Sequence, residues 1–478
     1  MPVGGHTGVA LGESAARSSP SFAATKYRTA SPAMTPNLKR MFDTLEPALL
    51  HYPAMATEAR ILGLQCLRCR ARFDEPRLFT GCPRCRAEGV AVNLTVEYDL
   101  APLAGVTREA FAPAGKGLWR FRHLLPARSA KPVSLGEGAT PLVYLERLGR
   151  RLGVPKLYAK DESQNPTWSY KDRLCAVAVT HAVTIGARVI TISSTGNHGA
   201  STAAYAARAG LPCVVFTLAS VPETMKTLMQ AYGAAVVACP TSESRWDLMR
   251  QGIERFGWYP TSGFIAPPVG SNPWGVEGYK TIAYEVAEDL GWTAPDVVVV
   301  PSAYSDGLYG IWKGWTELKT LGLVKHAPRM IAAEPFGPLA HALEQKLTAP
   351  EIVEAPAPSV AFSIASRYGT WQGLAALRGS GGAGVRLTDE GIFEAQRALA
   401  REEGLYVEPS SAAALTAVMQ LAGRKALDPE QTIVIVLTSG GLKDTGATRT
   451  WLPPVPAADG DFDRVLTVLR EAYGLALD

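Results

Sequence analysis

Short runs rich in Val and Ile alternate with longer helix-like stretches over most of this 478-residue chain. Runs of this length and composition are typical of buried parallel strands. They lie at 188–194, 212–218, 234–240, 296–302, 329–335 and 432–439, and the helical stretches lie at 198–209, 222–232, 243–256, 388–404 and 410–422. The alternation predicts an α/β fold with parallel sheets, which bind ligands at the carboxyl ends of their strands.

The bulk composition is that of a globular protein, with 47% apolar and 19% charged residues. A formal net charge of +4 is weak for this length and nominates no nucleic-acid or membrane partner. No apolar run approaches the roughly 20 residues that span a bilayer. The sequence also shows no hydrophobic signal-peptide core, so we expect a cytoplasmic protein.

Residues 1–50 are predicted to form a disordered or extended tail. Within residues 1–42, rich in Ser, Ala, Pro and Thr, Glu13 is the only acidic residue. This composition also faintly resembles an organelle transit peptide. The low hydrophobicity favours the disordered tail.

Four of the seven cysteines form two C-x2-C pairs separated by twelve residues: Cys66, Cys69, Cys82 and Cys85. Four thiolates in two knuckles supply the tetrahedral ligand set that zinc prefers. Four unrelated cysteines are the alternative. The spacing predicts a zinc-ribbon-like module over residues 51–95, and a closed four-cysteine site leaves no open position for substrate, which indicates a structural metal. We expect the arginines between these cysteines to form a solvated surface.

The segment "ISSTGNHGASTAAYAARAGL" (192–211) predicts a strand, a tight loop and a helix. Backbone N–H groups at such a loop form a site for a carboxylate or a phosphate. Asn197 lies in the loop, where its side chain can bond a ligand oxygen. For His198, a capping or packing role and a catalytic role both remain open.

The segment "NPTWSYKDRLCAV" (165–177) places Lys171 where an Asn-Pro turn leads into an apolar helical run. Taken alone, Lys171 is either a solvated lysine at a helix start or a reactive amine. A reactive amine must lose its proton, and a free lysine has a pKa of about 10.4, so burial near cationic or apolar groups is required.

Several segments together resemble the threonine synthases, which are fold type II enzymes dependent on pyridoxal 5′-phosphate. They are "LGEGATPL" (135–142), "NPTWSYKDR" (165–173), "SSTGNHGASTAAYAARAG" (193–210), "NPWGVEGYKT" (272–281), "GIWKG" (310–314), "EGLYVEPSSAAAL" (403–415) and "VLTSGGLKD" (436–444). The resemblance implies a tryptophan synthase β-like fold over residues 96–478, with two parallel or mixed-sheet subdomains. The smaller one, at about 175–285, is inserted in the larger one. The family also implies a homodimer.

The resemblance implies roles for individual residues. Lys171 would hold the cofactor, Asn197 would bond its phenolic oxygen, and Thr438 would meet its pyridine nitrogen; the alternative for Thr438 is a plain strand-end threonine. Substrate would meet the residues Ser194, Thr195, Gly196, His198 and Arg367.

The family's glycine-rich phosphate loop is replaced here by "VPSAYSDGLYG" (300–310). We expect the cofactor phosphate to lie on the backbone of the residues Ser302, Ala303, Tyr304, Ser305, Asp306 and Gly307. The carboxylate of Asp306 would repel a phosphate unless its side chain points away.

A second departure is Gly275, which stands where the family has an arginine. A phosphorylated substrate needs cations, and arginine binds phosphate with two parallel hydrogen bonds. Lys160 or Arg173 is expected to compensate. Trp168 and Trp274 are expected to narrow the pocket.

Three functions are therefore considered. The first is the threonine synthase reaction, in which O-phosphohomoserine loses phosphate, gains water and becomes threonine. The second is β-elimination or β-replacement on a serine-, threonine- or phosphoserine-like amino acid, as in dehydratases and cysteate synthase. The third is a non-catalytic zinc-ribbon binding protein on a retired enzyme fold. The presence of Lys171, Asn197 and Thr438 argues against the third.

Overall fold

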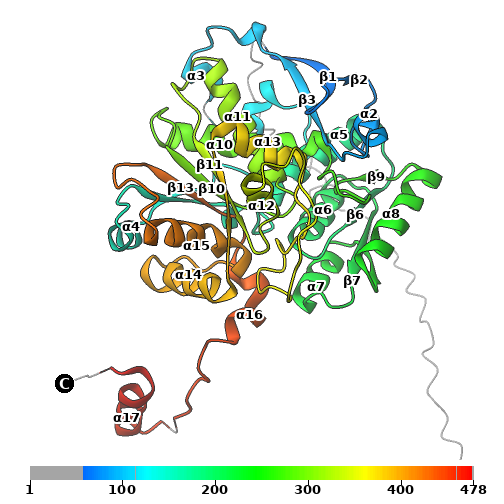
Figure 1. The fold of residues 1–478 in the computed structure, drawn as a ribbon. Helices are drawn as coiled ribbons and strands as arrows, with labels where there is room; N and C mark the ends of the chain where they lie inside the picture. The colour runs from blue at the N-terminus through cyan, green and yellow to red at the C-terminus, as the bar shows by residue number, and fades with distance from the viewer. Residues whose placement is uncertain (1–57, 114, 459, 476–478) are drawn as a thin grey trace, which may run out of the picture. The chain divides into compact units, whose positions relative to one another are not determined.

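The computed structural model describes residues 58–113, 115–458 and 460–475, so the predicted tail at 1–50 lies outside the described residues. In this part of the chain the strands form sheets of three, six and four strands (Figure 1). No helix among the described residues is long and apolar enough to cross a bilayer.

The first sheet is antiparallel and belongs to the cysteine module. Its order is β2-β1-β3, built from β1 (Arg60–Cys66), β2 (Arg72–Phe73) and β3 (Leu94–Asp99). The short helix α2 (Pro83–Ala87) follows Cys82. The chain then runs through η1 (Ala101–Leu103), α3 (Arg108–Phe111) and η2 (Leu118–Leu124).

The six-stranded sheet has the order β12-β11-β10-β13-β5-β4. Its strands are β4 (Leu142–Tyr144), β5 (Leu157–Asp161), β10 (Val297–Pro301), β11 (Arg329–Glu334), β12 (Ala383–Arg386) and β13 (Ile433–Leu437). All pairs are parallel except β4 with β5. The central strands are buried on both faces, as their continuous β-branched sequences predict.

Helices cover both faces of this sheet. Alternate residues of the central strands, such as Val297, Val299 and Ile435, pack with α4 (Glu146–Leu152), α14 (Asp389–Glu402) and α15 (Pro409–Gly423). On the other face, α11 (Asp306–Thr320) and α13 (Trp371–Ser380) contact β10 or β11 (Figure 1). Helix α12 (Pro338–Glu344) packs beside β12, and α10 (Lys280–Asp289) packs on α11.

The four-stranded sheet is parallel and has the order β8-β7-β6-β9. Its strands are β6 (Ile190–Ser193), β7 (Cys213–Leu218), β8 (Ala235–Cys239) and β9 (Tyr259–Pro260), and its helices are α6 (Asn197–Arg208), α7 (Glu223–Ala231) and α8 (Ser242–Phe256). The expectation that residues 234–240 form a buried strand was wrong in one respect. β8 is an edge strand, so several of its residues reach solvent.

Helix α5 (Lys171–Thr184) lies against α6 and against α9 (Pro273–Val276). The remaining helices are η3 (Glu162–Gln164), η4 (Glu277–Tyr279), η5 (Gly441–Asp444), α16 (Thr445–Arg449) and α17 (Phe462–Tyr473). Each of the predicted parallel strands and helices has its counterpart, within a few residues at either end. The exact bounds of the smaller subdomain stay a prediction.

Candidate active site

Lys171 is the first residue of α5, and the chain before it is tied to a neighbouring strand. The N–H of Tyr170 donates to the carbonyl oxygen of Thr438, just after β13, at 2.9 Å. Nζ of Lys171 lies 4.9 Å from the ring centre of Tyr170 and 5.7 Å from that of Tyr279. The amine therefore lies beside aromatic faces in a half-buried position.

The next residue, Asp172, is fully buried and anchors the start of the helix. Its carboxylate accepts hydrogen bonds from the N–H of Thr167 at 2.6 Å, the hydroxyl of Thr167 at 2.5 Å and the hydroxyl of Ser201 at 2.6 Å. Burial raises the pKa of Asp172 to about 6, although these donors oppose the shift. Since Ser201 is on α6, Asp172 joins the lysine segment to the helix of the glycine-rich loop.

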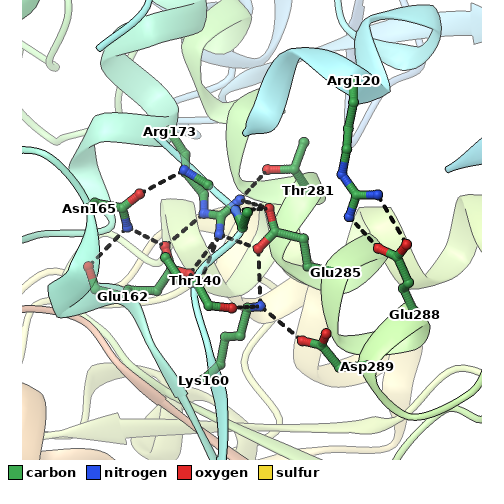
Figure 2. A network of polar contacts seen from close by, with 12 residues as sticks. Arg120, Thr140, Lys160, Glu162, Asn165, Arg173, Thr281, Glu285, Glu288 and Asp289 are labelled. Carbon is green, nitrogen blue, oxygen red and sulfur yellow. Dashed lines mark hydrogen bonds and ion pairs between the residues drawn. The ribbon is translucent and has the colours of Figure 1, made fainter. Parts of the chain in front are cut away.

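Arg173 lies at the centre of a buried charge cluster (Figure 2). Its guanidinium contacts the carboxylates of Glu162 and Glu285, with N–O distances of 2.7–2.8 Å. Lys160 lies 3.0 Å from Glu285 and 3.2 Å from Asp289. The expectation that Lys160 or Arg173 binds substrate phosphate was wrong, because both cations are fully buried and already neutralised by these acids.

A cavity of about 740 Å³ lies beyond the carboxyl ends of β6, β7, β10 and β13. This is where a parallel sheet is expected to bind a ligand. The predicted catalytic, cofactor-binding and substrate-binding residues, except Ser302, all line it: Lys171, Ser194, Thr195, Gly196, Asn197, His198, Ala303, Tyr304, Ser305, Asp306, Gly307, Arg367 and Thr438. The hydroxyl of Ser302 instead donates to the carbonyl oxygen of Val300 at 3.1 Å, so it is turned back onto its own strand.

The loop between β6 and α6 is organised around Ser194. Its hydroxyl oxygen accepts from the N–H of Gly196 at 3.2 Å and of Gly199 at 3.0 Å. His198 follows in the first turn, buried, and its Nε2 has no partner among the described residues. Burial and the nearby Lys171 hold the pKa of His198 well below its ordinary value, so the imidazole is neutral at physiological pH.

Glu408 is a cavity residue that sequence reasoning missed. Nδ2 of Asn197 donates to both of its carboxylate oxygens, at 2.9 and 3.1 Å, while Ser439 Oγ donates to Asn197 Oδ1 at 3.2 Å. Burial raises the pKa of Glu408 to about 7, and the charge of Lys443 partly opposes the shift. The signal was the acid before proline in "EPSSAAAL", at the N-cap of α15.

Asp306 begins α11 and points its carboxylate away from the loop backbone. It accepts from the N–H of Ser271 at 2.9 Å, the hydroxyl of Ser271 at 2.6 Å and Nε2 of Gln372 at 2.5 Å. Nδ2 of Asn93, in the cysteine module, donates to Ser271 O at 3.0 Å and to Gln372 Oε1 at 3.4 Å. These bonds hold the Asp306 carboxylate toward Ser271 and Gln372.

Gly275 does not belong to the cavity wall. A Cβ added at this position would lie 2.9 Å from Ala178 Cβ and 3.0 Å from Leu174 Cγ, both on α5. Glycine therefore lets α9 pack closely on the helix that carries Lys171.

The two tryptophans do not narrow the cavity, contrary to expectation. Trp168 is half exposed and has a φ of 56°, a conformation that explains why the resembling family has glycine there. Trp274 is buried against His181, with ring centres 4.3 Å apart, and its Nε1 donates to Pro76 O at 3.0 Å.

The four module cysteines converge on one point. Their sulfur atoms all lie within 4.8 Å of one another, with Cys66 to Cys85 and Cys69 to Cys82 both at 3.6 Å. These separations exceed the 2.05 Å of a disulfide and match the edges of a tetrahedron with metal–sulfur bonds of about 2.3 Å. The N–H groups of Arg68 and Cys69 point at Cys66 Sγ, which stabilises a thiolate.

The sequence model of the family described as "Pyridoxal-phosphate dependent enzyme" matches residues 133–439, which include every cavity residue predicted above. The chain belongs to this family. Its cofactor is therefore pyridoxal 5′-phosphate, and its fold is that of the fold type II enzymes.

Two similar proteins are archaeal threonine synthases. The threonine synthase of Methanocaldococcus jannaschii is 34% identical over 80% of this chain and 93% of its own. That of Methanosarcina acetivorans is 33% identical over 84% of this chain and 97% of its own. The protein is thus a threonine synthase-like enzyme of the lyase class.

Solved structures show the same fold. Diaminopropionate ammonia lyase from Escherichia coli superposes with a TM-score of 0.57 at 18% identity, covering 67% of this chain and 89% of that one. Maize serine racemase superposes with a TM-score of 0.55 at 18% identity, covering 70% of this chain and 94% of that one. At these identities the likeness concerns the fold alone.

The cavity residues suit pyridoxal 5′-phosphate. Ser305 Oγ and His198 Nε2 are buried and have no partner among the described residues, so both can still bond a ligand. Helical bonding in α11 begins with Tyr309 N–H onto Ser305 O, which leaves the first N–H groups of this helix for an anion. A lysine amine, an amide side chain and this helix start meet in one cavity.

Proposed function

We propose that the enzyme converts O-phosphohomoserine, or a closely related phosphorylated amino acid, to threonine by loss of phosphate and addition of water. The observation that carries the proposal is the convergence of Lys171, Asn197 and Thr438 on one cavity, from three segments distant in the sequence. The relatives named threonine synthase support it.

In this proposal Lys171 would hold the cofactor, and its free amine would move the substrate's α-proton. The bound cofactor supplies an electron sink for the α-carbon. Tyr170 and Tyr279 shield the amine, because their rings lie beside Nζ and exclude water from one side.

Asn197 and Thr438 orient the cofactor ring. Glu408 and Ser439 hold both ends of the Asn197 amide, so its direction toward a ligand is set before binding. Thr438 offers a neutral hydroxyl, which does not hold a pyridine nitrogen protonated as a carboxylate would. This tempers the electron sink and favours elimination over transamination.

The start of α6 is proposed to bind the substrate carboxylate through Ser194, Thr195 and Gly196. Ser194 already accepts two backbone N–H groups, so its contribution is to shape the loop. His198, being neutral, adds a hydrogen-bonding group without adding charge. Arg367 donates from Nε to Val353 O at 2.8 Å and keeps its remaining donors for the cavity mouth.

A second candidate is β-elimination or β-replacement on a serine-, threonine- or phosphoserine-like amino acid. The glycine at 275, in place of the arginine of the resembling family, keeps this candidate open. A non-catalytic zinc-ribbon protein is excluded as an alternative by the family membership and the intact lysine site.

An absorption spectrum tests the lysine site. Protein supplied with the cofactor should show a band at about 410–430 nm. Lys171→Ala should lose the band, whereas Lys156→Ala, at an exposed pair with Glu430, should keep it. A band that survives in Lys171→Ala would refute the proposed attachment.

A product assay separates the two reactions. O-Phosphohomoserine, serine and threonine are each incubated with the enzyme, and phosphate, threonine and 2-oxo acid are measured. Phosphate with threonine from O-phosphohomoserine supports the first candidate. 2-Oxo acid from serine or threonine, without phosphate release, supports the second.

Two further proposals concern assembly. We infer that the four cysteines bind a structural zinc ion, supported by the sulfur separations. We also infer a homodimer, from the family resemblance, and sedimentation analysis of the purified protein tests it.

A further inference from the structure

Arg245 is a buried cation in the cavity wall that no sequence motif marked. It lies on α8, beside the four-stranded sheet, and lines the cavity with its helix neighbours Ser242 and Trp246. Only 7% of its surface is exposed. It therefore reaches the cavity from the same sheet that carries the Ser194–Asn197 loop.

The guanidinium of Arg245 is incompletely bonded. Nη2 donates to Ser242 Oγ at 3.1 Å, while Nε is buried and has no acceptor among the described residues. Among the described residues, no carboxylate lies within ion-pair distance of the Arg245 guanidinium. The other buried arginines among the described residues contrast with it: Arg120 contacts the carboxylate of Glu288, and Arg173 contacts two carboxylates.

A buried and unpaired charge is unfavourable unless a partner of opposite charge arrives. Burial lowers the pKa of Arg245, but arginine stays protonated at any physiological pH. The acids that line the same cavity do not neutralise it. Glu243 precedes it on α8 without pairing, and Asp306 and Glu408 are bonded to other cavity residues. The site is therefore suited to an anionic ligand.

Arginine is also the cation best matched to phosphate, which its planar fork binds through two hydrogen bonds. The cofactor's phosphate has a separate candidate site at the start of α11. Gly275 faces α5, so no side chain from that position supplies a cation. Arg245 thus remains as a cavity cation without a partner.

We propose that Arg245 binds the phosphate group of the amino-acid substrate and thereby selects substrates with an anionic side chain. This inference rests on the proposed function and names the residue that would set its substrate class. The cofactor's own phosphate is the other phosphate group within reach of Arg245, because Tyr304 of the 302–307 loop lies close to Arg245.

The test compares Arg245→Gln and Arg245→Lys with Arg250→Gln. Arg250 is an exposed residue of the same helix, paired with Asp247 and Glu254. Cofactor-loaded protein is titrated calorimetrically with 2-amino-5-phosphonopentanoate, which carries a phosphonate that cannot be eliminated, and with norvaline, which lacks it. Cofactor affinity is measured separately on cofactor-free protein, and thermal unfolding reports folding.

Wild-type protein should bind the phosphonate more tightly than norvaline. Arg245→Gln should weaken phosphonate binding about 10–100-fold, the loss expected for one charged hydrogen-bonded contact. Norvaline and cofactor affinities should change by less than about threefold, within the ordinary scatter of such contacts. The phosphonate affinity of Arg245→Lys should lie between those of wild type and Arg245→Gln, and that of Arg250→Gln should match wild type.

Equal weakening of both ligands, or no weakening, would overturn the inference. A loss of cofactor affinity with unchanged phosphonate binding would assign Arg245 to the cofactor instead. Failure of the proposed function looks different: wild-type enzyme would release no phosphate from O-phosphohomoserine, whatever the ratio of phosphonate to norvaline affinity.

Discussion

Asn197 and Glu408 lie 211 positions apart in sequence and are joined by two hydrogen bonds, from Asn197 Nδ2 to Oε1 at 2.9 Å and to Oε2 at 3.1 Å. Asn197 starts α6 beside the four-stranded sheet, whereas Glu408 caps α15 on the six-stranded sheet. The pair therefore connects the two sheets at the cavity, and its protonation state bears on how the cavity binds a ligand.

The first prediction concerns the pH dependence of this pair. The pKa of Glu408 in the folded protein, about 7, lies above the usual value of about 4.3 for an unfolded chain. The folded state thus binds an extra proton between these values, so stability from this group is present at low pH and lost as pH rises toward 7. The charged neighbours of Glu408 are Lys443 and Asp444, and both are kept in the Glu408→Gln variant with which the wild type is compared.

Urea unfolding of wild type and Glu408→Gln at pH 5, 6, 7 and 8 measures the effect. Relative to the variant, the wild-type free energy of unfolding should fall by about 1–3 kcal/mol between pH 5 and 8. The cofactor absorption band should also respond to pH near 7 in wild type only. A free-energy difference that stays constant across pH would contradict the prediction.

The second prediction concerns the buried charge cluster of Figure 2. Arg173→Met leaves the carboxylates of Glu162 and Glu285 buried with less positive charge beside them. The variant should lose about 3–5 kcal/mol of stability in urea unfolding. Arg250→Met, which breaks only exposed pairs, should change little. If Arg173→Met loses as little stability as Arg250→Met, the cluster is not a tight ion network.

The third prediction is that Gly275→Arg, which introduces the arginine of the resembling family, does not give a stably folded enzyme. The new Cβ would overlap Ala178 and Leu174. Gly275→Arg should therefore separate α9 from α5 or prevent the protein from folding. Gly275→Ala should cost about 1–3 kcal/mol for the same overlap.

Gly423→Ala is the control, because an added Cβ there meets no atom within 4 Å and should leave stability nearly unchanged. A folded Gly275→Arg enzyme with tighter phosphonate binding would show that this position does reach the cavity.

The fourth prediction concerns the cysteine module. Purified protein should contain about one zinc ion per chain, and Cys85→Ser should lose it. The module contacts the catalytic region through Lys313 Nζ with Thr95 Oγ1 at 3.0 Å and through Asn93 with Ser271. Loss of metal should therefore lower the melting temperature of the enzyme by at least about 5 °C.

Cys239→Ser, outside the module, should retain metal and melt as wild type does. Unchanged melting of metal-free protein would show that the module's fold does not depend on the ion. Loss of activity with full stability would indicate a catalytic metal instead.

Much of this protein could be predicted from local sequence. The β-branched runs identified the parallel strands because such side chains fill a sheet buried on both faces. The motifs at 165–173, 193–210 and 436–444 led to cavity residues because each lies at a strand end or a helix start, where backbone geometry directs it to the sheet edge. Ser302 does not line the cavity, because its hydroxyl bonds its own strand, and its predicted contact with the cofactor phosphate stays a prediction.

Sequence by itself determined the elements, the lysine at a helix start and the paired cysteines, since all of these depend on residues within a few positions of one another. Only the tertiary structure decided where charged side chains find partners. It directed Arg173 and Lys160 into a core of acids, turned Asp306 toward Ser271, and left Arg245 buried without an acid. Electrostatic pairing depends on distances between segments far apart along the chain, and no local pattern encodes those distances.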